Sequence, residues 1–183
     1  ESKALPLLEL TTKERQWIKE HPQIIVGGEK DWPPFDFVDG NGEYMGITND
    51  YLQEIARLSG LKFKIEPYDW NILIKKIKEK KIDLMPAINY RKERESFLNF
   101  TSKYYHLESY IFVKENDDSI EKETDLNGKT VAIPRGYSYI KYLHEHYPQA
   151  TVLEVDDMQA CISAVLTGKA DAMIDSFTVV TFY

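Results

Sequence analysis

Two arginines follow a short apolar run in a pattern that suits the binding of an anion. Arg91 and Arg94 lie in "NYRKERESFLNF", directly after the apolar stretch "IDLMPAI". A guanidinium group can hold a carboxylate through two parallel hydrogen bonds, which gives both affinity and orientation. The same arginines can instead pair with Glu93 or Glu95 at the surface. Judged from the residue types alone, the two interpretations are about equally supported.

The turn "PRGYSY" is a second candidate for anion binding. It joins the apolar run "TVAIP" to a segment with helical spacing. Gly136 and the backbone amides of Tyr137 and Ser138 can present a helix N-terminus to an anion. The alternative is a tight strand-to-helix turn that Ser138 caps. Two such positions, each at the end of a strand, point to binding more strongly than either does alone.

The stretch "DWPPFDF" (31–37) has the composition of a binding-site wall. Consecutive prolines do not suit a core strand, because each removes a backbone donor. Three large aromatic rings do not suit a flexible linker. We therefore expect this loop, with Asp31, Trp32 and Phe35, to form one wall of a ligand cleft.

Signatures of catalysis and metal binding are missing. The sequence has no GxSxG, HExxH or CxxC motif and no glycine-rich phosphate loop. In "HEH", His144 and His146 are two positions apart, so on a helix they face different sides and do not easily share one ion. The sequence therefore predicts no catalytic residue, no metal site and no cofactor.

The candidate binding residues lie between short apolar runs and amphipathic segments that alternate along the chain. "QIIVGG", "LKFKIEP" and "IDLMPAI" are expected strands; "GITNDYLQEIARLSG" and "DWNILIKKIKEKK" are expected helices. The first of these helices has Ile47, Tyr51, Ile55 and Leu58 on one face, and the second has Asp69 as its N-cap. The alternation predicts an α/β fold with mainly parallel sheets, in which ligands bind at the carboxyl ends of strands.

The same alternation starts again after "HLES", which indicates two lobes. We expect a leader helix in 1–22, a first lobe in 23–107 and a second lobe in 108–183. We expect the second lobe to be truncated, because the sequence stops in the first turns of an expected helix and nothing after it returns to the first lobe. Thr11 or Thr12 is expected to cap the leader helix, with Glu14 in its first turn.

Composition narrows the class of partner. The formal net charge of −7 argues against nucleic-acid binding, which requires a basic face. The single cysteine, Cys161, excludes an intrachain disulfide and is expected to be a small buried hydrophobe. No stretch is apolar enough to span a membrane.

Four motifs in order resemble a known family. "IIVGGEKDWPPFDFVDGNGEYMGITNDYLQEIA", "KIDLMPAINYRKERESFLNFTSKYY", "DLNGKTVAIPRGYSYIKYL" and "VLTGKADAMIDS" are similar to the bacterial extracellular solute-binding proteins of the polar-amino-acid type. These are Venus flytrap domains, two α/β lobes that close on a small molecule. The leader "LTTKERQWIKEHP" resembles the segment that precedes such domains in sensor proteins, especially transmembrane histidine kinases and diguanylate cyclases.

The resemblance implies roles for particular residues. Arg94, rather than Arg91, matches the arginine that holds the α-carboxylate of an amino-acid ligand. Trp32 and Phe35 match the aromatic wall. The other ligand-binding positions implied by the family are the end of the preceding strand, the turn before the second-lobe helix and the residues after "ADAxx": Ala87, Asn89, Gly136, Tyr137, Ser138, Asp175 and Ser176.

One position departs from the family pattern. Amino-acid binders usually have an acid after "ADAxxx" to hold the α-amino group, and this sequence has Ser176 there, with Asp175 one residue earlier. Adjacent residues point in different directions, so Asp175 is a poor substitute. This departure weakens the amino-acid interpretation and favours a simple carboxylate or another small polar ligand.

The expected function is extracytoplasmic binding of a small anionic or zwitterionic solute, an amino acid or carboxylate, by a sensor input domain. The location implied is the periplasmic or extracellular face of the membrane, with a membrane-bound signalling or permease partner. The alternatives are a free receptor of an ABC transporter, a cyclohexadienyl-dehydratase-like enzyme on the same fold, and an interaction module that has lost its ligand. The segment itself is expected to lack catalytic activity, whatever output domain follows in a longer protein.

Overall fold

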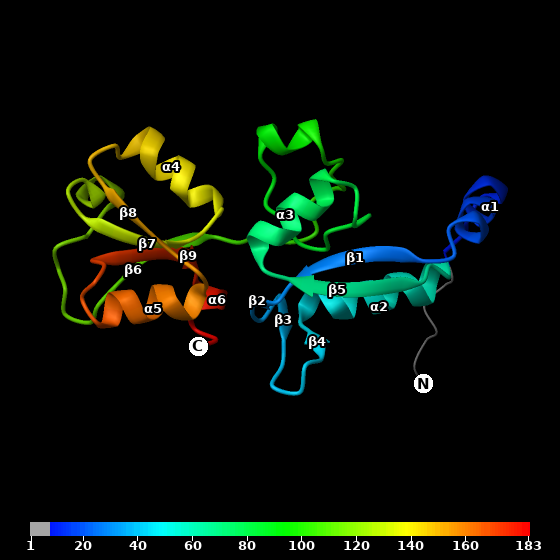
Figure 1. Cartoon of the computed structure of the whole chain (residues 1–183), viewed down its shortest axis with the longest axis horizontal. Helices are drawn as coiled ribbons and strands as arrows, with labels where there is room; N and C mark the ends of the chain where they lie inside the picture. The colour runs from blue at the N-terminus through cyan, green and yellow to red at the C-terminus, as the bar shows by residue number, and fades with distance from the viewer. Residues whose placement is uncertain (1–7) are drawn as a thin grey trace. The chain divides into compact units, whose positions relative to one another are not determined.

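The computed structural model describes residues 8–183, which form two compact units (Figure 1). Of the described residues, unit 1 contains 8–30 together with Phe35–Phe100, and unit 2 contains Asp31–Pro34 together with Thr101–Tyr183. The chain passes from one unit to the other within 97–108, which carries no helix or strand. The expected boundary at 107 and 108 lies in the same segment and stays a prediction.

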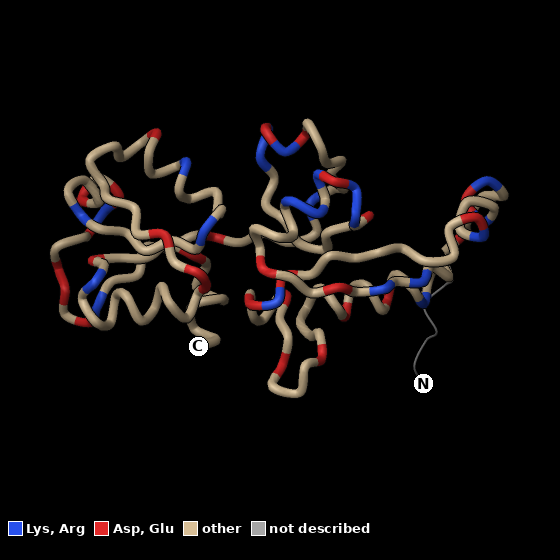
Figure 2. The backbone as a smooth tube through the Cα atoms, in the orientation of Figure 1, with Lys and Arg blue, Asp and Glu red and all other residues tan. Residues whose placement is uncertain are grey.

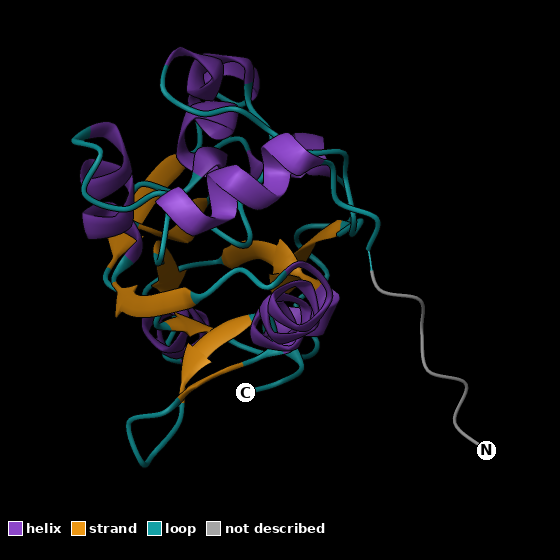
Figure 3. Cartoon of the chain, turned by 90° about the vertical axis from the view of Figure 1, so that its right-hand side faces the viewer, coloured by secondary structure: helices purple, strands orange, loops and turns teal. Residues whose placement is uncertain are grey.

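Unit 1 contains two longer parallel strands, a short antiparallel pair and three α-helices (Figures 1 and 3). Its elements are α1 (Thr12–Glu20), β1 (Ile24–Glu29), β3 (Asp36–Val38), β4 (Tyr44–Met45), α2 (Ile47–Ser59), β5 (Phe63–Tyr68), α3 (Trp70–Lys78) and the 3₁₀ helix η1 (Lys92–Ser96). The expected leader helix is present as α1. Thr11 caps it in a capping box, in which the Thr11 hydroxyl accepts from the Glu14 amide and the Glu14 carboxylate accepts from the Thr11 amide.

Parallel pairing of β1 with β5 runs from Ile24 opposite Phe63 to Glu29 opposite Tyr68. The prediction that "IDLMPAI" forms a strand was wrong, because this segment makes only an isolated β-bridge, between Leu84 and Val26. The Gly27 amide donates to the Leu84 carbonyl at 2.9 Å. Two residues further on, Pro86 has no N–H to continue such a ladder.

Helix α2 faces the sheet with a different side from the expected one. Leu52 and Thr48 are buried, whereas Tyr51 and Ile55, which were expected on one apolar face, are exposed. The hydroxyl of Thr48 donates to the Phe35 carbonyl at 3.1 Å, and the Thr48 amide donates to the same carbonyl. Thr48 and Leu52 are four residues apart and therefore lie on the same face of α2. These hydrogen bonds orient that face toward the interior.

Helix α3 packs on the β1–β5 pair through a buried cluster of Leu73, Ile77 and Ile82. Asp69 is the N-cap residue as expected by position, but its side chain makes no capping hydrogen bond. Its carboxylate instead forms an ion pair with Lys30 at 2.8 Å. An exposed pair of this kind contributes little to stability, so α3 depends mainly on its buried face.

Gly28 in β1 is in close contact with Tyr44. A Cβ atom at Gly28 would lie 2.7 Å from Cζ and 2.8 Å from the hydroxyl oxygen of Tyr44. We expect Gly28→Ala to lower the free energy of unfolding by about 1–3 kcal/mol, because the Tyr44 ring must move from its site. Chemical denaturation measures this, with Gly40→Ala as the control, since a Cβ at Gly40 meets nothing within 4 Å. Equal stability of the two variants would contradict the prediction.

Unit 2 is a four-stranded sheet with helices on both faces (Figure 1). Its elements are β2 (Asp31–Trp32), β6 (Ser109–Val113), the 3₁₀ helix η2 (Glu123–Leu126), β7 (Thr130–Pro134), α4 (Ser138–His146), β8 (Thr151–Val155), α5 (Met158–Leu166), β9 (Ala172–Ser176) and α6 (Phe177–Val180). The sheet order is β6-β9-β7-β8, with β7 parallel to both of its neighbours and β6 antiparallel to β9. The predicted mainly parallel α/β architecture is confirmed.

The interior of unit 2 is mainly apolar. Val131, Ile133, Leu143 and Ile174 belong to one buried cluster that joins α4 to the sheet. Cys161 on α5 is buried, as expected, and burial raises the pKa of its thiol to about 12. Across residues 8–183, no helix has the length and apolar character needed to cross a membrane.

Candidate functional site

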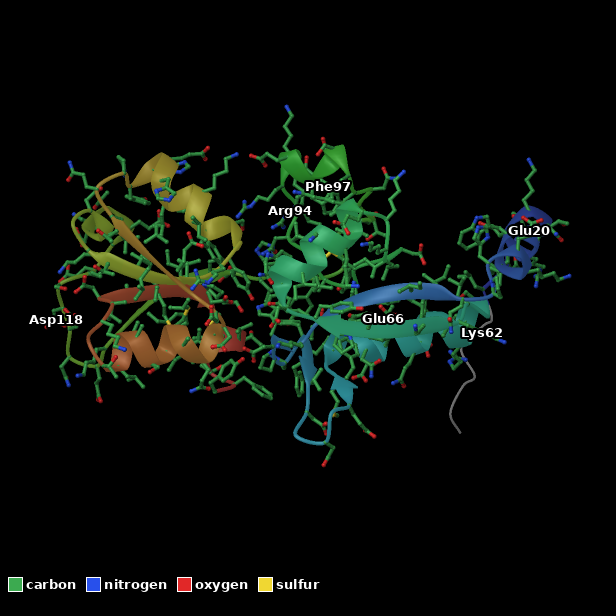
Figure 4. All side chains as sticks on the ribbon, in the orientation of Figure 1. Glu20, Lys62, Glu66, Arg94, Phe97 and Asp118 are labelled. Atoms are coloured by element: carbon green, nitrogen blue, oxygen red, sulfur yellow. The ribbon has the colours of Figure 1, made fainter. Side chains whose placement is uncertain are left out.

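Arg94 is held in a defined position in unit 1 (Figure 4). It lies in η1, and its Nη1 donates to the Asn89 carbonyl oxygen at 2.6 Å. Its guanidinium carbon lies 5.3 Å from the centroid of the Trp70 ring, within the range of a cation–π contact. The structure therefore brings together two predicted site residues, Asn89 and Arg94. The third, Ala87, is half-buried in the same segment.

Within residues 8–183, no carboxylate forms an ion pair with the Arg94 guanidinium. Surface pairing with Glu93 or Glu95 was the alternative expectation. The Glu95 carboxylate accepts from the Tyr90 hydroxyl at 2.8 Å, and Glu93 acts on Arg94 only through its nearby charge, which raises the pKa of the guanidinium. Burial lowers the pKa of Arg94, and the nearby charge of Arg91 lowers it further. An arginine nevertheless stays protonated, so this is a partly buried cation.

The geometry around Arg94 suits a carboxylate. A guanidinium has five N–H donors. Among the described residues, the acceptor for these donors is the Asn89 carbonyl. The last turn of α3 carries three lysines, whereas η1 has two acidic residues beside its two basic ones (Figure 2). An incoming carboxylate would restore the missing charge balance through parallel hydrogen bonds.

Trp70 was missed as a site residue. The sequence places it at the start of an amphipathic helix, where an aromatic residue is usually part of the core. In the structure it is the first residue of α3, and its ring supports Arg94. Only long-range folding brings residues 70 and 94 together, so helical periodicity carries no signal of the contact.

Phe35, predicted as an aromatic wall, is almost fully buried. The next residue, Asp36, is only 1 % exposed and accepts hydrogen bonds from the hydroxyls of Tyr44, at 2.6 Å, and Thr48. Burial raises the pKa of Asp36 to about 7, although the bonds from Tyr44 and the Glu29 backbone act in the opposite direction. The aromatic loop is therefore followed by a buried carboxyl that the sequence analysis did not single out.

The predicted turn in unit 2 is built on glycine. Gly136 has a φ of 77°, in the left-handed region that glycine adopts without a steric cost. The Tyr137 amide donates to the Pro134 carbonyl at 3.1 Å, so that amide closes the turn. The alternative in which Ser138 caps the helix is wrong, because Tyr137 is the N-cap residue and Ser138 already lies one position inside α4. A helix N-terminus does follow the turn, as the sequence predicts.

Asp175 and Ser176 are both buried at the end of β9. The Ser176 hydroxyl accepts from the Val179 amide at 3.3 Å and caps α6. The Asp175 carboxylate accepts from the Ser176 amide at 2.6 Å and from the Trp32 side chain, while burial raises its pKa to about 6. Two predicted residues far apart in sequence, Trp32 and Asp175, are thus in contact within unit 2.

Asp31 lies beside Trp32 in β2 and accepts a hydrogen bond from the Tyr183 hydroxyl at 2.7 Å. Within residues 8–183, the structure contains no cluster of three or more histidine, cysteine, aspartate or glutamate residues able to hold a metal ion.

Known sensor proteins are similar to almost the whole chain. The chain is 32% identical to the sensor protein EvgS of Escherichia coli K12 over 168 residues, and 29% identical to the virulence sensor protein BvgS of Bordetella pertussis over 174 residues. These matches cover 91% and 94% of this chain, respectively, but only 14% of each sensor protein. The L-cystine-binding protein TcyJ of E. coli K12 is 26% identical over 86% of this chain and 60% of its own length.

Solved structures agree with these matches. The periplasmic VFT2 domain of B. pertussis BvgS superposes with a TM-score of 0.83 at 29% identity, covering 96% of this chain and 75% of that one. An ancestral arginine-binding protein bound to glutamine gives 0.80 at 28% identity, covering 88% of this chain and 72% of its own. The fold is the α/β periplasmic-binding-protein fold, the Venus flytrap, which confirms the sequence-based prediction.

A family model decides the classification. The model of the bacterial extracellular solute-binding proteins, family 3, matches residues 24–138. This range contains the strands and helices of unit 1 after α1 and reaches the turn at Gly136 in unit 2. The chain therefore belongs to the bacterial extracellular solute-binding proteins of family 3.

Proposed function

We propose that the chain is the input module of a sensor protein and binds a small solute with a carboxylate group, an amino acid or a simple carboxylic acid. Its expected location is the periplasmic or extracellular face of the membrane, with a membrane-bound signalling partner. Ligand binding changes the output only if the ligand has different affinities for two conformations of the module. The catalytic step of such a sensor belongs to a domain outside this chain.

The observation that carries this proposal is the environment of Arg94. Its guanidinium is partly buried, rests on the Trp70 ring and has one hydrogen bond to the Asn89 carbonyl, with no ion pair among residues 8–183. A charge removed from water without a partner is unfavourable. A ligand carboxylate is the natural partner, and its two oxygens match the fork of guanidinium donors.

The sensor role is favoured over a transport role by similarity. The two sensor proteins are 29% and 32% identical to this chain, whereas the L-cystine-binding protein and an E. coli arginine-binding protein of an ABC transporter are 26% and 23% identical. A free receptor that delivers its solute to a permease is therefore the second candidate. Both roles use the same carboxylate site, so they differ in the partner and not in the ligand chemistry.

The test is a thermal-shift screen of amino acids, dicarboxylates and aromatic acids against the purified chain. A ligand at one hundred times its dissociation constant adds about 2.7 kcal/mol to the free energy of unfolding, which moves the melting temperature by several degrees. A matched set of amines and alcohols without a carboxylate is the control. We expect stabilisation by carboxylates alone.

The outcomes distinguish the classes of ligand. Stabilisation by amino acids but not by their deaminated analogues would mean that the ammonium group is also bound, despite Ser176 at the position of the usual acid. Stabilisation by simple carboxylates would support a binding site in which Arg94 holds the carboxylate and no ammonium group is bound. Failure of every carboxylate to stabilise the chain would overturn the proposal.

A further inference from the structure

The carboxyl end of α3 in unit 1 carries a dense group of lysines. The segment "KKIKEKK" (75–81) contains five lysines and a single acid, although the whole chain has 30 acidic and 23 basic residues. Three of the lysines lie in the last turn of α3 and two in the turn that follows it (Figure 2). We call these residues the lysine patch: Lys75, Lys76, Lys78, Lys80 and Lys81.

The charge of the lysine patch is largely exposed and not neutralised by the protein. Four of its side chains are exposed, and that of Lys76 is half-buried. Lys81 forms an ion pair with Glu79 at 2.7 Å. Within residues 8–183, neither Lys75 nor Lys80 forms an ion pair. The patch therefore presents several positive charges to whatever lies outside it.

Two of the lysines have defined positions on aromatic rings. The Lys76 Nζ lies 4.3 Å from the centroid of the Tyr68 ring, and the Lys78 Nζ lies 4.9 Å from that of Phe97. A cation–π contact of this kind leaves the full charge of the ammonium group in place, because the ring carries no net charge. These contacts hold the two lysines beside α3 without cancelling their charge.

The needs of the helix do not explain so many lysines. A cation in the last turn stabilises a helix through its dipole, and this effect falls off within that turn. The last turn of α1 has one basic residue, Lys19, that of α2 has one, Arg57, and that of α5 has none. Lys80 lies beyond the C-cap residue Glu79 and has a φ of 54°, in the left-handed region that glycine adopts without a steric cost. The sequence thus carries more positive charge here than α3 requires.

The charge pattern indicates the kind of partner. An amphipathic helix with a cluster of four to eight basic residues is typical of proteins that bind anionic lipid headgroups. The segment 75–81 has a net charge of +4, and removing it from the total of −7 leaves −11 for the rest of the chain. Charges farther away than about 10 Å are largely screened at 0.1 M salt, so the distant acids do not cancel the attraction of the patch.

We propose that the lysine patch docks unit 1 on a membrane surface that contains anionic phospholipids, with the ammonium groups of the lysines on the phosphate oxygens of the headgroups. The contact is peripheral and electrostatic, and it orients unit 1 on the membrane. It does not involve Arg94 and does not depend on the carboxylate ligand proposed above.

The probe is a set of vesicles of phosphatidylcholine, with and without phosphatidylglycerol, that are sedimented together with the purified chain. We expect the partition coefficient to be about tenfold or more higher on the vesicles with phosphatidylglycerol, and to fall as the salt concentration rises. Equal binding to both kinds of vesicle, or binding to neither, would overturn the proposal.

Paired substitutions locate the contact. Lys75→Gln combined with Lys80→Gln is expected to lower the partition coefficient about fivefold or more. The matched control combines Lys114→Gln with Lys169→Gln, two exposed lysines of unit 2 whose loss changes the net charge by the same amount. The control should change the partition coefficient by less than about twofold. Circular dichroism shows whether both variants are folded. An equal loss in both folded variants would mean that total charge, and not the lysine patch, is responsible.

Two competitors separate a membrane surface from other anionic partners. Glycerol 1-phosphate, added at constant ionic strength, is a single free phosphate and should not displace the chain, because the contact is made with many headgroups at once. Displacement by it would overturn the proposal in favour of a site for a small anion. Binding to polyglutamate without binding to the vesicles would assign the patch to an acidic protein and would also overturn it.

Discussion

Arg94→Ala is expected to weaken the binding of the best carboxylate ligand from the screen by about 30-fold or more. Truncating one member of a desolvated, hydrogen-bonded charge pair costs about 2–5 kcal/mol, much of it because the other charge is left unpaired. The guanidinium lies over Trp70 and is fixed by the Asn89 carbonyl, so no neighbouring cation replaces it in the same geometry. Isothermal titration calorimetry measures the change.

Two further variants make the result specific. Arg94→Lys keeps the charge but loses the planar fork of donors, so an intermediate loss is expected. Arg57→Ala is the matched control, because Arg57 is an exposed arginine of unit 1 whose guanidinium is already paired with Glu54 at 2.6 Å. If Arg94→Ala and Arg57→Ala bind the ligand equally well, the carboxylate anchor has been assigned to the wrong residue.

The stability of the chain is expected to fall as the pH rises from about 4 to 7, and Asp36 is the main cause. Burial raises the pKa of Asp36 from 3.8 to about 7 in the folded state. Between these values the folded chain holds a proton that the unfolded chain releases, so the contribution is present at low pH and lost as the pH rises through the folded pKa. Its size is up to about 4 kcal/mol at 1.36 kcal/mol per pKa unit.

The hydroxyls of Tyr44 and Thr48 both donate to the Asp36 carboxyl. Asp175 has a pKa raised to about 6 by burial, and its ionisation lowers the stability in the same direction.

Urea denaturation at pH 5 and pH 8 measures this effect. Asp36→Asn should remove most of the difference between the two pH values, because the amide does not ionise. Asp39→Asn is the control, since Asp39 is only half-buried in the turn between β3 and β4, and hydrogen bonds from the turn backbone and Asn41 lower its pKa. A difference that persists in Asp36→Asn would mean that another group is responsible.

Local patterns in the sequence predicted most helices and strands. The capping box at Thr11 and Glu14 depends on residues three apart, and the parallel strands β1 and β7 are short apolar runs. These signals lie within one element, so no tertiary contact is needed to detect them. The four ordered motifs extended the prediction from single elements to the family, which the match over 24–138 confirms.

Other features depended on contacts between distant segments. The rotation of α2 follows from bonds between Thr48 and the Phe35 carbonyl, and "IDLMPAI" failed to form a strand because only part of it reaches β1. Periodicity identifies an apolar face, but the side that is buried depends on which segment packs against it.

Some features of the candidate site could likewise be predicted from the sequence, and others could not. The sequence by itself determined the mainly parallel α/β fold, the family, and Arg94 and the Gly136 turn as candidates, because residue type and order carry that information. The tertiary structure alone decided that Arg94 rests on Trp70 without an ion pair among residues 8–183, that Trp32 contacts Asp175, and that Asp36 is buried. Desolvation and charge pairing depend on neighbours brought together by folding, and these neighbours are distant in the sequence.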